Sequence, residues 1–100
     1  MMTLSPEQKK KFRAMAQHLS PVTTVGQKGI TQGVLRQIAD DLINHELIKI
    51  KIKADDRLVR AGMLQEILGA TGCELVQTIG QVAVLYREGE SQKINSNQLH

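Results

Sequence analysis

Residues 47–53 read Leu-Ile-Lys-Ile-Lys-Ile-Lys, and this alternation constrains the fold more than any other part of the chain. Successive side chains of a β-strand point to opposite faces, so the three isoleucines share one face and the three lysines the other. A strand buried on both faces would not tolerate three lysines, so one face of its sheet must meet water or a ligand. The isoleucines are Ile48, Ile50 and Ile52, and the lysines are Lys49, Lys51 and Lys53.

Other local signals place this strand in a series of helices and strands. Ser5-Pro6-Glu7-Gln8 carries the cap and capping-box residues of a helix that we expect to run to about His18. Thr31 is a candidate cap for a second helix, and Asp55 or Asp56 for a third that ends near Gly69 and Gly72. We expect strands over 22–25, 47–53, 73–79 and 82–87, the last two joined by a type II′ turn at Gly80-Gln81.

This order predicts the fold class α/β (α+β-like). A single domain of helix, strand, helix, strand, helix, strand, strand gives a four-stranded mixed sheet with three helices, which we expect on one face. Each helix carries an apolar stripe at helical spacing that should be buried, and the second has a polar side that includes Asp40 and Asp41. The stripes are Phe12, Met15, Ala16 and Leu19; then Val34, Leu35, Ile38, Leu42 and Ile43; then Val59, Met63, Leu64, Ile67 and Leu68.

The length and the polarity of the chain bound its class. One hundred residues suit one domain, and no apolar run approaches the roughly 18–20 residues of a membrane span. The first residues lack the apolar core of a signal peptide, so we expect a cytoplasmic protein with no membrane partner. The sequence turns polar after Glu88, so residues 1–88 are the expected folded domain and 89–100 an expected disordered tail.

The charge is unevenly distributed along the chain. Residues 1–60 hold eleven Lys or Arg and six Asp or Glu, a balance of +5, whereas residues 61–100 hold two and four, a balance of −2. Such asymmetry suggests an anionic partner. The chain has no Trp, one Phe and one Tyr, which argues against a module that stacks successive bases on aromatic rings.

The residues suited to catalysis or metal binding are scattered. Cys73 is the sole cysteine, and His18, His45 and His100 lie far apart without metal-ligand spacing. Asp40 and Asp41 diverge by about 100° on a helix, so they do not form a carboxylate dyad. We therefore expect no enzyme activity, no metal and no other cofactor.

The sequence Gly26-Gln27-Lys28-Gly29 lies between a predicted strand and a predicted helix. Two glycines permit a tight turn, whose amides and those of the helix start would face outward, where a phosphate can accept from them. Lys28 adds a positive charge, as in the G-x-x-G loop by which KH domains clamp a nucleic-acid backbone. An ordinary strand-to-helix connection would look the same, so both interpretations stay open.

Two rows of basic residues accompany this loop. Alternate lysines on the strand are about 6.6 Å apart, which approximates the spacing of successive phosphates, although lysines also protect exposed edge strands from aggregation. The first helix carries Lys9, Lys10, Lys11 and Arg13, which also fit an ordinary solvated face.

Three blocks of sequence, in order, resemble the CRM family (chloroplast RNA splicing and ribosome maturation), specifically its small free-standing bacterial members. The resemblance covers about residues 3–87. The blocks are Gly26-Gln27-Lys28-Gly29-Ile30-Thr31 with Gly33-Val34-Leu35, then His45-Glu46-Leu47-Ile48-Lys49-Ile50-Lys51, then Ile79-Gly80 leading into Val84-Leu85-Tyr86-Arg87.

The resemblance implies a compact α/β RNA-binding fold similar to the C-terminal domain of the third bacterial translation initiation factor. It also implies association with precursors of the large ribosomal subunit, and it places the family's G-x-x-G loop on residues 26–29. Related plant domains serve in group II intron splicing factors. The basic positions outside the loop are less fixed in the family.

We therefore expect a monomeric RNA-binding protein without a small-molecule substrate, which contacts ribosomal RNA through phosphates. Tyr86 is the one candidate for base stacking, although a half-buried strand tyrosine fits equally well. Two alternatives remain, an adaptor that docks an acidic protein on its sheet face and a small enzyme acting on RNA. The expected RNA contacts are Gly26, Gln27, Lys28, Gly29, Lys9, Lys10, Arg13, Lys49, Lys51, Lys53 and Arg87.

Overall fold

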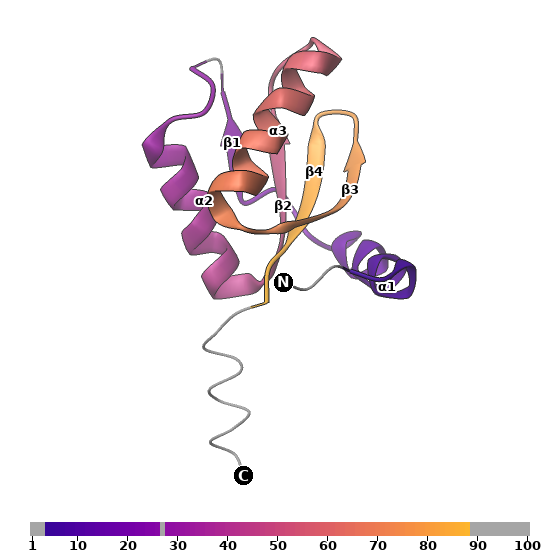
Figure 1. The fold of residues 1–100 in the computed structure, drawn as a ribbon. Helices are drawn as coiled ribbons and strands as arrows, with labels where there is room; N and C mark the ends of the chain where they lie inside the picture. The colour runs from indigo at the N-terminus through magenta and orange to yellow at the C-terminus, as the bar shows by residue number, and fades with distance from the viewer. Residues whose placement is uncertain (1–3, 27, 89–100) are drawn as a thin grey trace.

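The computed structural model describes residues 4–26 and 28–88, and over these residues the chain forms three helices and a four-stranded mixed sheet, which confirms the expected fold class (Figure 1). The prediction of a disordered tail at 89–100 lies outside the described residues. In chain order the elements are α1 (Pro6–Ala16), β1 (Thr23–Val25), α2 (Gln32–His45), β2 (Leu47–Ile52), α3 (Arg57–Thr71), β3 (Glu74–Ile79) and β4 (Val82–Tyr86).

Each helix begins where the sequence predicts a cap. Ser5 Oγ accepts from the Gln8 amide at 3.1 Å, and Gln8 Oε1 accepts from the Ser5 amide at 2.8 Å, which completes a capping box. Thr31 Oγ1 accepts from the Val34 amide at 3.1 Å. Asp56, one of the two candidates for α3, accepts from the amides that open that helix. The backbone donors that a helix start leaves unpaired are thus satisfied by side chains.

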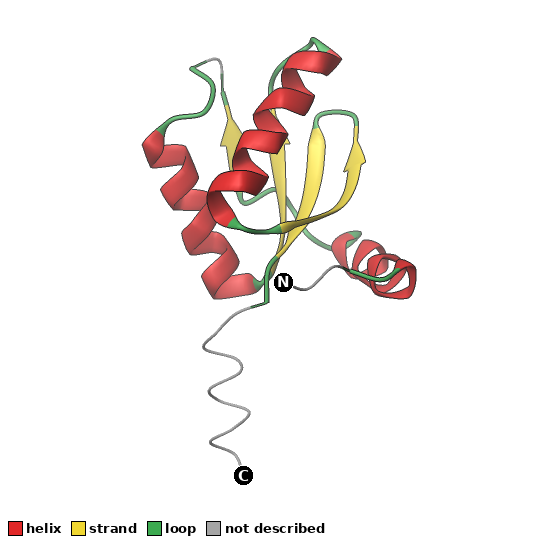
Figure 2. Ribbon diagram, viewed as in Figure 1, coloured by secondary structure: helices red, strands yellow, loops and turns green. Residues whose placement is uncertain are grey.

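The strands are arranged in the order β1-β2-β4-β3, which leaves β1 and β3 at the two edges (Figure 2). β1 runs parallel to β2, whereas the β2–β4 and β3–β4 pairs are antiparallel. The β3–β4 hairpin turns at Gly80-Gln81, where Gly80 has a φ of 57°, the positive value that the first position of a type II′ turn requires.

The helices divide between the two faces of the sheet, so the expectation of a single covered face is wrong for α1 (Figures 1 and 2). α2 and α3 cover the face of the three isoleucines, as predicted. α1 packs on the lysine face, where Phe12 and Ala16 meet Leu47. Leu47 shares this face with the lysines because it stands two residues before Lys49, so the face has an apolar end that receives a helix and a basic end that does not.

Two apolar clusters result, one on each face. Among the described residues the larger one buries Val25, Ile38, Leu42, Ile48, Ile50, Ile52, Leu64, Ile67, Cys73, Ala83 and Leu85. The smaller one buries Leu4, Ala16, Leu47, Val76 and Val84, with Phe12 and Tyr86 packed against them.

Four residues of the predicted buried stripes are exposed instead. Met15, Leu19, Ile43 and Val59 have exposed fractions of 49%, 36%, 55% and 52%. Met15 and Ile43 lie in the last turn of α1 and α2, Val59 in the first turn of α3, and Leu19 beyond the end of α1. A helix has fewest neighbours at its ends, so the periodic pattern overestimates burial there.

Asp41 departs from its predicted place on the polar side of α2, because its side chain is buried. Asp41 Oδ2 accepts from the Thr23 hydroxyl of β1 at 2.8 Å, and Oδ1 accepts from Gln37 Nε2 at 3.1 Å. The carboxylate therefore joins α2 to the edge strand β1, immediately before the 26–29 loop.

We expect the substitution Asp41→Ala to lower the free energy of unfolding by about 1–2 kcal/mol, because two partly buried hydrogen bonds are lost. The neighbouring Asp40→Ala removes the same charge from an exposed position and should change it by less than about 0.5 kcal/mol. Urea denaturation measures both, and equal losses would contradict the assignment of Asp41 as a structural tie.

Candidate functional site

The 26–29 loop is a closed turn between β1 and α2. The Gly29 amide donates to the Gly26 carbonyl oxygen at 3.0 Å, and Gly29 has a φ of 75°, which a residue with a Cβ rarely adopts. The Gly29 donor is therefore used inside the turn and does not face outward as expected. Gln27, also a predicted contact, lies outside the described residues.

At position 26 the fold leaves room for a side chain, so packing within the protein does not require a glycine there. The φ of Gly26 is not positive, and a Cβ at this position would meet no described atom within 4 Å beyond its chain neighbours. The backbone at Gly26 is exposed, and Lys28 is exposed beside it. Bare, accessible backbone of this kind permits a ligand to approach closely.

The pairing of β1 with β2 brings the lysine row to this loop. Thr24 pairs with Lys51, and the Lys53 amide donates to the Val25 carbonyl oxygen at 2.9 Å. Neighbouring strands lie about 4.8 Å apart, so the end of β2 runs directly beside the start of the loop. Lys49 and Lys51 are partly exposed and Lys53 is exposed, which makes this corner of the lysine face accessible and basic.

The remaining predicted contacts lie at the opposite end of the sheet. Lys9, Lys10 and Arg13 are carried by α1, which packs where β2 begins (Figure 1). The Arg87 amide donates to the Glu46 carbonyl oxygen at 2.9 Å, which places Arg87 at the same end. A strand of six residues spans about 20 Å, so the structure does not gather the predicted residues into one cluster.

Tyr86 stacks within the protein. Its ring lies 4.3 Å from that of Phe12, centroid to centroid, with an interplanar angle of 19°. Burial raises the pKa of the Tyr86 phenol, and the negative charges of Glu46 and Glu88 add to the effect. One face of the ring is thus already occupied, which favours the half-buried interpretation over base stacking.

The titratable residues outside the basic rows form no metal site within residues 4–26 and 28–88. His18 and His45, which the sequence keeps far apart, line one hollow together with Lys49 and Met15. Cys73 is buried in the larger cluster, and burial raises the pKa of its thiol, as expected for a core residue.

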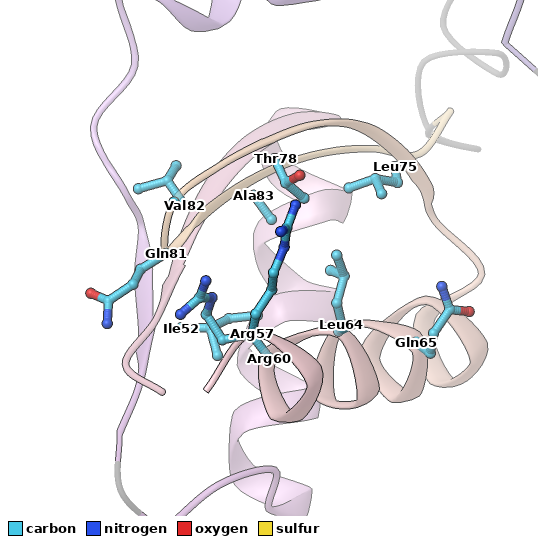
Figure 3. Close-up of a pocket in the computed structure, with 12 residues that line it drawn as sticks. Ile52, Arg57, Arg60, Leu64, Gln65, Leu75, Thr78, Gln81, Val82 and Ala83 are labelled. Carbon is cyan, nitrogen blue, oxygen red and sulfur yellow. The ribbon is translucent and has the colours of Figure 1, made fainter. Parts of the chain in front are cut away.

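Sequence reasoning missed two arginines, Arg57 and Arg60 in the first turn of α3, which it counted only as charge. Both line a groove of about 620 Å³ between α3 and the β3–β4 hairpin (Figure 3). The available signal was their spacing of three residues, which places both on one side of a helix that follows the lysine row.

Comparisons with known proteins agree on one family. The sequence profile described as the CRS1 / YhbY (CRM) domain matches residues 4–87. A protein of Haemophilus influenzae named "RNA-binding protein" is 44% identical over 94% of this chain and 95% of its own length. A protein of Pseudomonas aeruginosa named "Probable RNA-binding protein" is 41% identical over 96% of this chain and 90% of its own length.

A solved structure supports the same assignment. The solution structure of a hypothetical protein from Staphylococcus aureus, described as an RNA-binding candidate, superimposes with a TM-score of 0.77. The two sequences are 34% identical, and the superposition covers 88% of this chain and 92% of the Staphylococcus aureus chain. None of the helices described here is long and apolar enough to cross a membrane.

Proposed function

Because the chain belongs to the CRS1 / YhbY (CRM) domain family, we propose that it binds RNA, and specifically ribosomal RNA in precursors of the large ribosomal subunit. The names of its relatives support RNA as the partner. The observation that carries the proposal is the junction of the 26–29 loop with the end of β2, where Lys53 donates to Val25. Exposed backbone and a row of ammonium groups meet there.

The RNA is held through its phosphates. A phosphate can approach the bare backbone at Gly26, with Lys28 beside it at the tip of the turn. Lys51 and Lys53 continue the row along β2 at about the spacing of successive phosphates. Contacts of this kind position the RNA without reading its sequence.

A second set of contacts lies about one strand length away, on Lys9, Lys10 and Arg13 of α1 and on Arg87. An RNA that meets the loop and α1 must extend along the lysine face, whereas Arg87 lines a hollow beside the end of α3. The spacing of the two sets therefore selects RNA by shape, as fits a protein that holds a folded but immature ribosomal RNA. In this proposal the protein acts as a cytoplasmic monomer and carries out no catalytic step.

Salt dependence tests the electrostatic part of the proposal. With four to six phosphate contacts, we expect log affinity to fall with log salt with a slope of about −3 to −4, since single strands contribute about 0.7 per contact. The measurement is a filter-binding titration with ribosomal RNA from large-subunit precursors. A slope near zero, or tighter binding to an acidic protein than to this RNA, would reject RNA binding led by phosphates.

Sedimentation of a lysate tests the ribosomal assignment separately. The protein should migrate with precursors of the large subunit and leave that fraction when the salt concentration is raised. Migration only with free RNA or free protein would refute the ribosomal role while leaving RNA binding intact.

A further inference from the structure

The groove between α3 and the β3–β4 hairpin lies outside every residue predicted to contact RNA. Its apolar wall is formed by Leu64 of α3 with Leu75 and Ala83 of the hairpin (Figure 3). Polar side chains, Gln65 and Thr78, stand on its two sides. A volume of about 620 Å³ lies within the range of about 300–1,000 Å³ that small-molecule sites occupy.

The charge of the groove is positive. None of its described lining residues is Asp or Glu, whereas two are arginines. Arg60 Nη1 donates to the Ala54 and Asp55 carbonyl oxygens at 2.6 and 3.1 Å, which fixes the guanidinium while its Nε and Nη2 donors take no part in these bonds. The nearby Asp56 carboxylate is engaged as the cap of α3. Arg57 is exposed.

The groove begins at the end of β2 on the isoleucine face of the sheet, whereas the proposed phosphate row lies on the opposite face. The Ile52 amide donates to the Gln81 carbonyl oxygen at 2.7 Å, and the next residue, Lys53, donates to Val25. The end of β2 therefore lies between the 26–29 loop on one side and the β3–β4 turn on the other. A single RNA strand that follows the lysines must therefore pass around the end of β2 to reach the groove.

We propose that this groove holds one unpaired nucleotide of the bound RNA, with its phosphate toward Arg57 and Arg60 and its base against the apolar wall. The proposal rests on the RNA binding proposed above. Guanidinium groups are suited to phosphate because they present several donors in a planar fork. The amides of Gln65 and Gln81 and the hydroxyl of Thr78 each offer both a donor and an acceptor to the edge of a base.

The test is a nuclear magnetic resonance titration of the full chain with each of the four nucleoside 5′-monophosphates. We expect at least one of them to shift the methyl signals of Leu64, Leu75 and Ala83 and the amide signal of Gln81. Inorganic phosphate alone should leave these methyl signals in place, because only a base reaches the apolar wall. The corresponding nucleoside, which lacks the phosphate, should bind more weakly.

Matched variants locate the phosphate. Arg57→Gln should raise the dissociation constant for the nucleotide by about fivefold, because it removes a charge-assisted contact. Arg36→Gln removes the same charge from the exposed side of α2, outside the groove, and should change it by less than about 1.5-fold.

Methyl signals that do not move, or equal effects of the two arginine variants, would overturn the nucleotide site. So would methyl shifts that inorganic phosphate alone reproduces. Ribosomal RNA binding measured on the same sample separates the two proposals. A protein that binds the RNA but leaves the groove unchanged refutes only the groove, whereas one that binds no RNA refutes both.

Discussion

Replacing both Gln27 and Lys28 with Asp is expected to lower the affinity for ribosomal RNA by about tenfold or more, equal to about 1.4 kcal/mol. The two carboxylates would stand next to the exposed backbone of Gly26, where we place a phosphate. Repulsion then replaces attraction at the centre of the proposed contact. Filter binding at moderate salt measures the loss.

The folded state should tolerate this change, because the turn depends on the retained Gly29, whose φ is positive, and Lys28 is exposed. We expect the free energy of unfolding to stay within about 1 kcal/mol of the original value. A loss of RNA binding without a loss of stability would therefore report on the contact itself.

The chain supplies a matched control, since Gln92-Lys93 repeats the same dipeptide in the polar tail. Substituting Asp at these two positions changes the net charge by the same amount, so the comparison separates the position of the new charges from their number. Equal losses of affinity would refute the proposed phosphate contact at the loop even if the protein proved to bind RNA.

The second large effect concerns the core. Ile50→Ala is expected to lower the free energy of unfolding by about 2–4 kcal/mol through lost burial and the cavity left behind. Ile50 is fully buried, with an exposed fraction of 0%, and its strand is hydrogen-bonded on both sides, where Thr23 and Ala83 are its partners.

The adjacent Lys51→Ala provides the comparison within one strand. Lys51 points to the lysine face and is partly exposed, so its truncation should change the free energy of unfolding by less than about 0.5 kcal/mol. Chemical denaturation of both variants measures the contrast. A costly Lys51→Ala or a harmless Ile50→Ala would show that the two faces of β2 are wrongly assigned.

Features set by neighbouring residues were predictable from the sequence. The caps at Ser5, Thr31 and Asp56 depend on a side chain and an amide two or three positions away, so the local pattern contains the whole interaction. The division of β2 into an isoleucine face and a lysine face follows in the same way from the period of a strand.

Features that depend on distant residues were not predictable. The stripe of Phe12 and Ala16 shows that α1 has a buried side, but not which face of the sheet receives it. Asp41 looked solvated because its partner, Thr23, is eighteen positions away and meets it only through the fold.

The candidate site shows the same division. The 26–29 loop and the lysine row were each visible as local patterns, whereas their contact depends on the parallel pairing of β1 with β2. Arg57 and Arg60 become candidate ligand contacts only because the β3–β4 hairpin forms the opposite wall of the groove, and this depends on the tertiary fold. Whether each predicted residue touches RNA stays a prediction.

The division of the core gives α1 a separate local stability. Among the described residues, five are buried in the cluster beneath α1 and eleven in the cluster beneath α2 and α3. The free energy of a sub-global opening increases with the number of buried contacts that it breaks. α1 can therefore detach and fray at a lower free energy than the sheet. By mass action, RNA that binds only the attached form of α1, through Lys9, Lys10 and Arg13, would suppress this opening. RNA binding would then slow the amide hydrogen exchange of α1, a helix about 20 Å from the loop.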